Sequence, residues 1–251
     1  MPTATQAKSG NGFRVNQAKA VMTADEYAQE FECSFEAAIK GAIYAKEMQQ
    51  AREDGRVTTV PYDPVLPVDT DWDLGVGDAM AIWFSQSTRG GEVRLIDYFE
   101  ASGEGFPFYV TMLREKGYNY GKHWAPHDIQ VREMSSGRSR LEVARSQGIT
   151  FEITPRLHHS VSGEVEEGIH AARMLLPRCW FDAKKCKAGL EALMHYRRDY
   201  NERLNEFKAT PVHDWSSHAC DALRGLAVRH QVPKEKRQRR PVVMPAAWAW
   251  A

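Results

Sequence analysis

The sequence predicts an α/β protein in which a mixed central sheet is flanked by helices. Between residues 68 and 101, three extended and largely apolar segments are separated only by short turns, which is typical of an antiparallel meander. From residue 107 onward, segments with helical periodicity alternate with short apolar segments, as expected when helices pack on a sheet.

Each element has its own local signal. Apolar and β-branched residues bounded by turn residues predict the strands, whereas strong helix formers with an apolar stripe predict the helices. The expected strands are 68–73, 79–86, 92–101, 122–128 and 148–155, with a brief strand within 180–184. The expected helices are 36–54, 107–116, 140–147, 161–176, 183–198 and 215–229, and residues 205–214 are expected to form a loop.

The length and composition fit one sizeable domain, or one domain with an attached segment. Of the 251 residues, 43% are hydrophobic, and no apolar run approaches the roughly 18 residues that a membrane-spanning helix needs. The N-terminus lacks the apolar core of a secretory signal, and the four cysteines form no C-x-x-C pair, so we expect a cytoplasmic protein. A net charge of zero argues against nucleic-acid binding over the whole surface.

Four regions are expected along the chain. They are a disordered N-terminus at 1–22, a helical segment and Pro-rich linker at 23–66, the main α/β domain at 67–231, and a basic, Pro-containing tail at 232–251. The basic run VPKEKRQRRP in the tail is open to two interpretations, a solvated segment or an arm that binds phosphates.

The stretch PVDTDWDLGVGDAMAIWF, residues 67–84, contains the most informative pattern. Asp69, Asp71 and Asp73 recur at spacing two, so on a strand their side chains share one face. Asp73 ends the strand just before a glycine turn. A carboxylate at the end of an apolar strand needs a partner, because burying it alone is unfavourable. Ordinary turn chemistry, which favours Asp, explains the pattern equally well at this point.

Two further acids could join Asp73. Asp128 ends the segment KHWAPHD, and ligand sites in open α/β sheets form beyond strand ends. Asp221 lies in the last helix beside an apolar stripe, where a carboxylate needs a charged partner. A divalent metal would be such a partner. Oxygen ligands without clustered Cys or His favour Mg²⁺ or Mn²⁺ over zinc.

At these residues the chain resembles the C-terminal nuclease domain of the large terminase subunit, the DNA-packaging motor of tailed double-stranded DNA bacteriophages. WDLGVGDAMAIWFSQ, APHD followed by SSGRSRLEVARSQGI, and HDWSSHACDALR are similar to the three acidic motifs of that domain, in the same order. YAQEFECSFEAAIKGAIYAKEM resembles the stretch that leads from the ATPase domain of that subunit into the nuclease. The resemblance spans residues 27–230.

The resemblance implies an RNase H-like fold and a divalent-metal-dependent endonuclease. Position by position, it assigns the catalytic and metal-binding carboxylates to Asp73, Asp128 and Asp221, holding two Mg²⁺ or Mn²⁺ ions about 3.5–4 Å apart in a two-metal mechanism. Its second-rank candidates are Asp78, His218 and His127. Basic residues that flank the second motif would position the DNA backbone or are solvated loop charges; they are Lys122, Arg132, Arg138 and Arg140.

The substrate implied by the resemblance is concatemeric double-stranded DNA, cut with low sequence specificity because the contacts would be mainly to phosphates. The implied partners are the portal protein and the small terminase subunit, with no membrane, in the cytoplasm of a bacterial host. The chain contains no G-x-x-x-x-G-K-[ST] loop, so we expect no ATPase. It would then be a nuclease fragment that was engineered, split off as a separate gene product, or left as a prophage remnant.

Two other functions stay open. One is a catalytically inactive terminase fragment that acts as a docking module. The other, suggested by DLGVGD, is an ATP-binding domain of the actin-like or sugar-kinase type, although no second Gly-rich phosphate turn is visible. A zinc site is disfavoured, because Pro126 lies between His123 and His127 and opposes a helix that would present both. Trp83, Trp180 and Trp215 are expected to be packing residues.

Overall fold

The computed structural model describes residues 41–75, 79–132, 137–156 and 161–231. Its elements, in chain order, are α3 (Ala45–Glu53), β1 (Val57–Thr58), β2 (Val68–Leu74), β3 (Ala79–Ser87), β4 (Val93–Ser102), α4 (Phe106–Lys116), β5 (Tyr120–Ala125), the 3₁₀ turn η2 (His127–Gln130), α5 (Arg140–Ser146), β6 (Phe151–Ile153), α6 (Val161–Leu175), η3 (Leu176–Arg178), β7 (Cys179–Asp182), α7 (Lys187–His195), β8 (Arg198–Asn201), β9 (Glu206–Pro211) and α8 (Ser217–Gln231).

Seven strands form one mixed sheet in the order β1-β7-β4-β3-β2-β5-β6. The neighbours β2, β3 and β4 form the predicted antiparallel meander. Parallel pairing then extends the sheet on both sides, through β5 and β6 next to β2 and through β7 next to β4. The predicted mixed central sheet is therefore confirmed.

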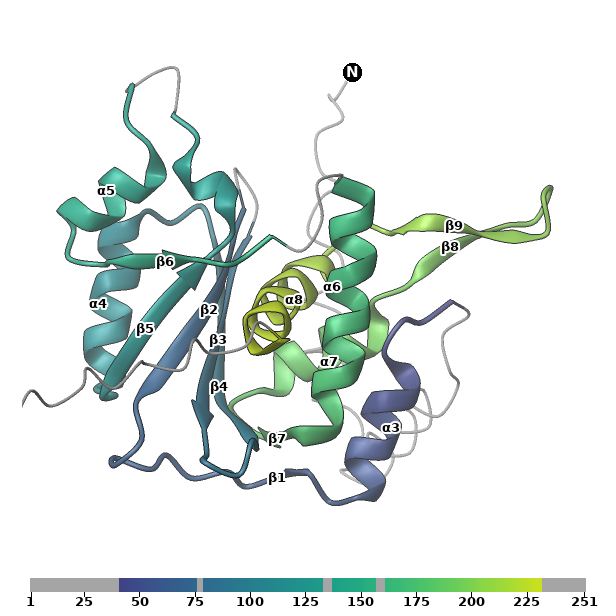
Figure 1. Cartoon of the computed structure of the whole chain (residues 1–251), viewed down its shortest axis with the longest axis horizontal. Helices are drawn as coiled ribbons and strands as arrows, with labels where there is room; N and C mark the ends of the chain where they lie inside the picture. Colours follow the sequence, from purple (N-terminus) through teal and green to yellow (C-terminus); the bar gives the residue numbers. More distant parts are fainter. Residues whose placement is uncertain (1–40, 76–78, 133–136, 157–160, 232–251) are drawn as a thin grey trace, which may run out of the picture.

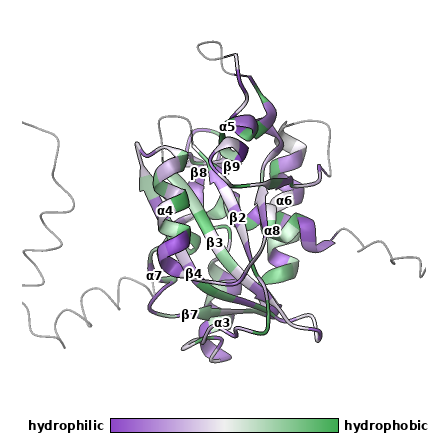
Figure 2. Ribbon diagram, turned by 90° about the vertical axis from the view of Figure 1, so that its left-hand side faces the viewer, coloured by the Kyte–Doolittle hydropathy of each residue, from purple (hydrophilic) through white to green (hydrophobic). Residues whose placement is uncertain are grey.

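Helices cover both faces of the sheet. The helices α4 and α5 lie on one side, and α3, α6, α7 and α8 lie on the other (Figure 1). Each face has its own hydrophobic core, so the central strand β3 is buried along nearly its whole length. Hydrophobic residues follow this strand in the ribbon coloured by hydropathy (Figure 2).

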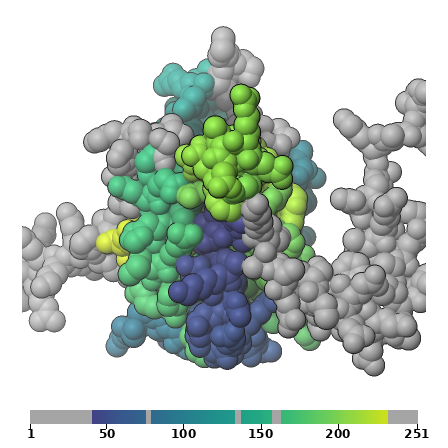
Figure 3. Space-filling model, turned by 90° about the vertical axis from the view of Figure 1, so that its right-hand side faces the viewer, coloured from purple at the N-terminus to yellow at the C-terminus, as the bar shows by residue number. Residues whose placement is uncertain are grey.

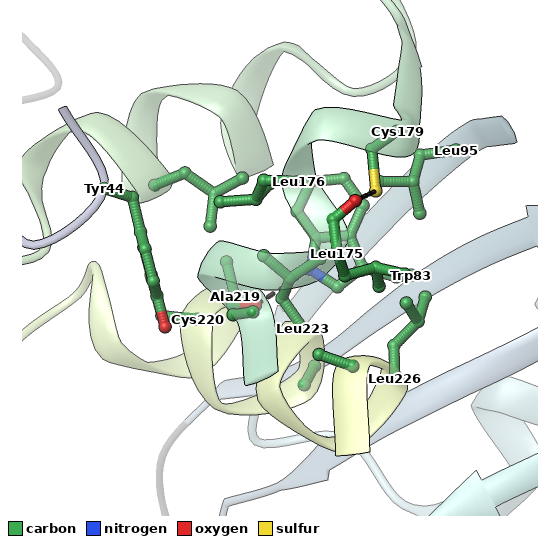
Figure 4. Packing of buried hydrophobic residues seen from close by; sticks show 14 of the residues in the cluster. Tyr44, Trp83, Leu95, Leu175, Leu176, Cys179, Ala219, Cys220, Leu223 and Leu226 are labelled. Atoms are coloured by element: carbon green, nitrogen blue, oxygen red, sulfur yellow. Dashed lines mark hydrogen bonds between the residues drawn. The ribbon is translucent and has the colours of Figure 1, made fainter. Parts of the chain in front are cut away.

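The core on the α8 side is built around Trp83 of β3. Its indole N–H donates to the carbonyl oxygen of Ala219 at 2.8 Å, and Leu223 and Leu226 of the same helix belong to the same buried cluster (Figure 4). On α7, a Cβ at Gly189 would collide with the indole ring, so glycine permits the close approach of that helix. These contacts hold α8 directly against the centre of the sheet.

The segment before the sheet contributes to this same core. Ile43, Tyr44 and Met48 are buried in the cluster around Trp83, and the amide of Ile43 donates to the carbonyl oxygen of Tyr196 at 2.8 Å. Figure 3 shows the face of the molecule on which α3, α6 and the β8–β9 hairpin lie together. In the described part of the chain, no helix is both long and apolar enough to cross a membrane.

Several predicted elements are wrong in detail. The helix predicted at 36–54 has its described part at α3, and residues 41–44 are not helical because Gly41 has a positive φ of 85°. The predicted linker contains β1, whose two residues pair in parallel with β7 and are too few to show periodicity. The predicted loop at 205–214 contains β9, which forms a hairpin with β8. The strand β9 is largely exposed and β8 is partly buried, and neither contains a fully buried residue, so no buried face imposes an apolar alternation.

Of the three tryptophans that were expected to be packing residues, two are buried or partly buried and one is exposed. Trp83 is fully buried and Trp180 is partly buried, but the Trp215 side chain is 53% exposed and its ring lies 5.3 Å from that of His195. Trp215 therefore differs from the prediction, because it precedes α8 in a turn rather than lying on the buried face of the helix. The described cysteines, Cys179, Cys186 and Cys220, are free and buried.

Candidate active site

The three aspartates of β2 share one face of the strand, as their spacing predicts, and in the structure this face is turned to α8. The register pairs Asp71 with Trp83 and Asp73 with Ala81, both of which belong to the core under α8. The alternate residues, including Trp72, belong to the core on the opposite face. The period of two in a strand thus places all three carboxylates on one side of the sheet.

Asp71 is buried and paired with an arginine. It is 1% exposed, and its two oxygens accept hydrogen bonds from Arg229 of α8, from Nε at 2.7 Å and from Nη2 at 2.8 Å. Arg229 Nη1 also lies 3.3 Å from Asp69, and the guanidinium lies 5.4 Å from the ring centre of Trp124. Burial raises the pKa of Asp71, and Arg229 opposes that rise. This ion pair fixes α8 on β2.

Asp73 has a more open environment. Its Oδ2 lies 3.2 Å from Nδ1 of His218 on α8, and its side chain is 21% exposed. The hydrogen bond with Asp73 raises the pKa of His218, although burial opposes the rise. His218 precedes Asp221 by three residues, so both project from the same side of α8.

Asp221 is the second acid that α8 brings to this end of the sheet. Its Oδ1 accepts a hydrogen bond of 2.6 Å from Nη2 of Arg224. Burial raises the pKa of Asp221 to about 6; Arg224 opposes that rise, and the negative charge of Asp73 adds to it. Asp73 and Asp221 are therefore close enough to interact electrostatically.

Asp128 lies beyond the end of β5 rather than on a strand. Its segment is the 3₁₀ turn η2, which follows Pro126 and so breaks the predicted strand at that residue. The strand β5 runs parallel to β2, and Trp124 is paired with Asp71. Asp128, four residues after Trp124, therefore lies at the same edge of the sheet as Asp73, near the end of β2. Its Oδ1 is buried and has no hydrogen-bond partner among the described residues.

The described residues do not form a complete metal centre. Among them, no hydrogen bond or ion pair joins Asp128 to Asp73 or Asp221, and no three His, Cys, Asp or Glu side chains are already arranged to hold an ion. The available donors nevertheless fit a hard divalent cation. Carboxylate oxygens predominate, one of them is buried without a partner, and two of the acids carry charges that are close together.

The second-rank candidates have different positions. Asp78 lies outside the described residues. His127 contacts the guanidinium of Arg156, and its Nδ1 lies 3.7 Å from Glu164 of α6. His218, in contrast, contacts Asp73 directly. Of the second-rank residues that the structure describes, His218 is therefore the one joined to a predicted ligand.

The four basic residues near the second motif also differ in their contacts. Lys122 lies 3.1 Å from Glu152, and its ammonium lies 5.3 Å from the ring centre of Trp124. Arg140 donates from Nη1 to the carbonyl oxygen of Leu74 at 2.8 Å, which ties the start of α5 to the end of β2. Arg132 and Arg138 lie near Glu142 and contribute to the lowered pKa of that carboxyl, whose main cause is the hydrogen bond from the Ser139 backbone.

Glu100 of β4 is a further candidate acid near Asp73, and the sequence patterns did not indicate it. Ala81 is paired with Asp73 on one side and with Glu100 on the other, so both acids lie in one row on the α8 face. The charge of Glu100 contributes to the raised pKa of His218, and its carboxylate accepts a hydrogen bond from the Tyr98 hydroxyl. Pairing the meander strands residue by residue would have indicated its position.

Comparison with solved structures finds similar folds among large terminases. One large terminase, from a thermophilic bacteriophage, is 17% identical with a TM-score of 0.54; the match covers 74% of this chain and 44% of that one. The P22 large terminase nuclease domain is 16% identical with a TM-score of 0.52, over 69% of this chain and 87% of that domain. The large terminase nuclease of thermophilic phage G20c, solved with bound cobalt, is 15% identical with a TM-score of 0.50, over 76% and 97%.

The sequence comparisons add no closer relative. No protein-family model matches the chain, and no curated protein matches it. The chain spans less than half the length of the first of these large terminases, and at these identities the likeness concerns the fold. The protein thus has the RNase H-like fold of large terminase nuclease domains, as the resemblance to that family implies.

Proposed function

We propose that this protein is a divalent-metal-dependent DNA endonuclease of the phage-packaging terminase type. The observation that carries the proposal is the convergence at one end of the sheet. There, α8 brings His218 and Asp221 to Asp73, while Asp128 presents a buried oxygen without a partner among the described residues. Asp71 has both oxygens bound by one guanidinium, whereas Asp73 contacts His218 through a single oxygen.

Asp73, Asp128 and Asp221 would hold Mg²⁺ or Mn²⁺, and two ions are proposed. The metal, when bound, would supply an acidified water and neutralise the charge that develops on the leaving oxygen. The protein's own part is to position the ligands. His218 holds Oδ2 of Asp73, and Arg229 fixes the position of α8 along β2. Arg140 holds the end of β2 through the carbonyl oxygen of Leu74.

The proposed substrate is concatemeric double-stranded DNA, contacted mainly through phosphates and therefore cut with low sequence specificity. The residues proposed to contact the DNA backbone are Lys122, Arg132, Arg138 and Arg140. In this proposal the partners are the portal protein and the small terminase subunit, and the reaction takes place in the cytoplasm of a bacterial host.

The test is cleavage of supercoiled plasmid by the whole chain with Mg²⁺ or Mn²⁺, with and without EDTA. Wild-type protein should nick the plasmid when metal is present, and the variants Asp73→Asn, Asp128→Asn and Asp221→Asn should each lower nicking on the order of a thousandfold. Glu115→Gln is the matched control, because it makes the same change from carboxylate to amide at an exposed position of α4, on the opposite face of the sheet.

The result also separates the proposal from a docking function. If wild-type protein nicks no better than the three variants, the nuclease proposal fails. A folded wild-type protein that binds packaging partners but neither nicks DNA nor responds to metal would be an inactive docking module. Nucleotide binding without cleavage would favour the actin-like alternative.

A further inference from the structure

Arg224 is a buried cation joined directly to a proposed metal ligand. It follows Asp221 by three residues on α8, and its Nη2 lies 2.6 Å from Oδ1 of that acid. The side chains of Arg224 and Asp221 are 15% and 28% exposed. The arginine is therefore the more enclosed of the two.

The guanidinium is held in place from several sides. Its aliphatic stem packs on α6 at Gly168, where an added Cβ would lie 3.2 Å from Cδ of Arg224. The stacked rings of Tyr44 and Tyr196, whose centres are 5.8 Å apart, lie near its charge. Burial raises the pKa of both phenols, and the positive charge of Arg224 opposes that rise.

One nitrogen of Arg224 is unsatisfied. Nη1 is buried and has no hydrogen-bond partner among the described residues, and the same is true of the Tyr44 hydroxyl. A buried guanidinium with one unmatched nitrogen and a short contact to a single carboxylate depends on that carboxylate for its neutralisation. Arg224 and Asp221 thus neutralise each other.

We propose that Arg224 is the tethered counter-ion of Asp221, a positioning residue that occupies Oδ1 and competes electrostatically with the divalent metal for this acid. The inference rests on the proposed metal site. A fixed positive charge in direct contact with a ligand repels an incoming dication, and this repulsion is strong in a partly buried site. Arg224 therefore neutralises Asp221 when no metal is bound and limits the affinity of the site for metal.

The test measures Mn²⁺ binding to the whole chain by electron paramagnetic resonance at pH 7.5, without DNA. Arg224→Met removes the charge but keeps much of the volume, and it should tighten binding about tenfold or more. Arg224→Lys keeps the charge and should bind within about threefold of wild type. Arg145→Met, at an exposed position of α5, is the matched control and should leave binding unchanged.

Two further measurements keep the inference falsifiable. Thermal unfolding shows whether each variant is folded at the temperature of the assay. Asp221→Asn, alone and combined with Arg224→Met, shows whether the change acts through Asp221; the combined variant should bind no more tightly than Asp221→Asn alone.

The outcomes distinguish this inference from the proposed function. If folded Arg224→Met binds Mn²⁺ as wild type does or more weakly, or if Arg224→Lys tightens binding as much as Arg224→Met, the counter-ion role is wrong while the metal site stands. If neither wild type nor any variant binds metal, the proposed function fails and the inference fails with it.

Discussion

The seam between β2 and α8 has two ends that share the same chemistry but differ in how it is satisfied. At one end, Asp71 is 1% exposed and both of its oxygens are bound by Arg229. At the other end, Asp73 is 21% exposed and contacts His218 through one oxygen. The two acids are neighbours on the same face of one strand, yet the first is neutralised by a permanent cation and the second contacts a histidine that titrates.

This difference separates the acid that holds α8 on β2 from the acid that we propose as a metal ligand. A buried carboxylate that accepts two hydrogen bonds from a guanidinium has both oxygens engaged and its charge neutralised by that cation. A partly exposed carboxylate near a second acid retains negative charge that an added cation can neutralise. The closed end, where Arg229 binds Asp71, fixes α8 on β2. In the proposed function, this fixed helix holds His218 and Asp221 beside Asp73 at the open end.

The largest expected effect is on catalysis at the open end. Asp73→Asn should lower plasmid nicking on the order of a thousandfold, because metal binding provides several kcal/mol of transition-state stabilisation. The free energy of unfolding should change by less than about 1 kcal/mol, because the side chain is partly exposed. Nicking rates and urea unfolding of the same preparation check this. An active Asp73→Asn variant would remove the distinction between the two ends.

The next effect is on stability at the closed end. Arg229→Met leaves Asp71 buried without its partner and should lower the free energy of unfolding by about 3–5 kcal/mol. The double variant Asp71→Leu/Arg229→Met removes both charges and should recover most of the loss. Urea unfolding measures both. If Arg229→Met is as stable as wild type, the closed end does not hold α8.

The pH dependence distinguishes the two ends further. Since the folded-state pKa of His218 is raised, its contact with Asp73 stabilises the fold fully below about pH 6.5 and loses that contribution as pH rises through the raised value. Arg229 stays charged over the same range. NMR titration should show a His218 pKa that falls in Asp73→Asn and is unchanged in Glu115→Gln; an unchanged value in Asp73→Asn would exclude the contact.

The smallest effect is expected at Lys122, which lies on β5 beside the strand that carries Asp73. Lys122 is already paired with Glu152 and is largely exposed, so Lys122→Ala should lower the free energy of unfolding by less than about 1 kcal/mol. If it contacts one phosphate, the salt dependence of DNA binding should weaken by about one unit of slope. Binding titrations at several salt concentrations measure the slope. A loss of nicking comparable to that of Asp73→Asn would place Lys122 inside the site.

Local patterns were sufficient to predict the meander and the shared face of the aspartates. Alternation of period two and short glycine turns act within a few residues, so the sequence displays them directly. The β8–β9 hairpin was missed because neither strand has a fully buried residue, and without a buried face its sequence carries no alternating pattern. Glu100 was missed because its place in the same row as Asp73, on the other side of Ala81, depends on the register of two strand pairs.

By itself, the sequence determined that Asp69, Asp71 and Asp73 lie on one face, because a strand alternates whatever surrounds it. Only the tertiary structure decided their different environments. Arg229 reaches Asp71, and His218 reaches Asp73, from a helix that is separated from β2 by most of the chain. The partners of a buried charge come from whichever element packs against it, and a local pattern does not contain that information.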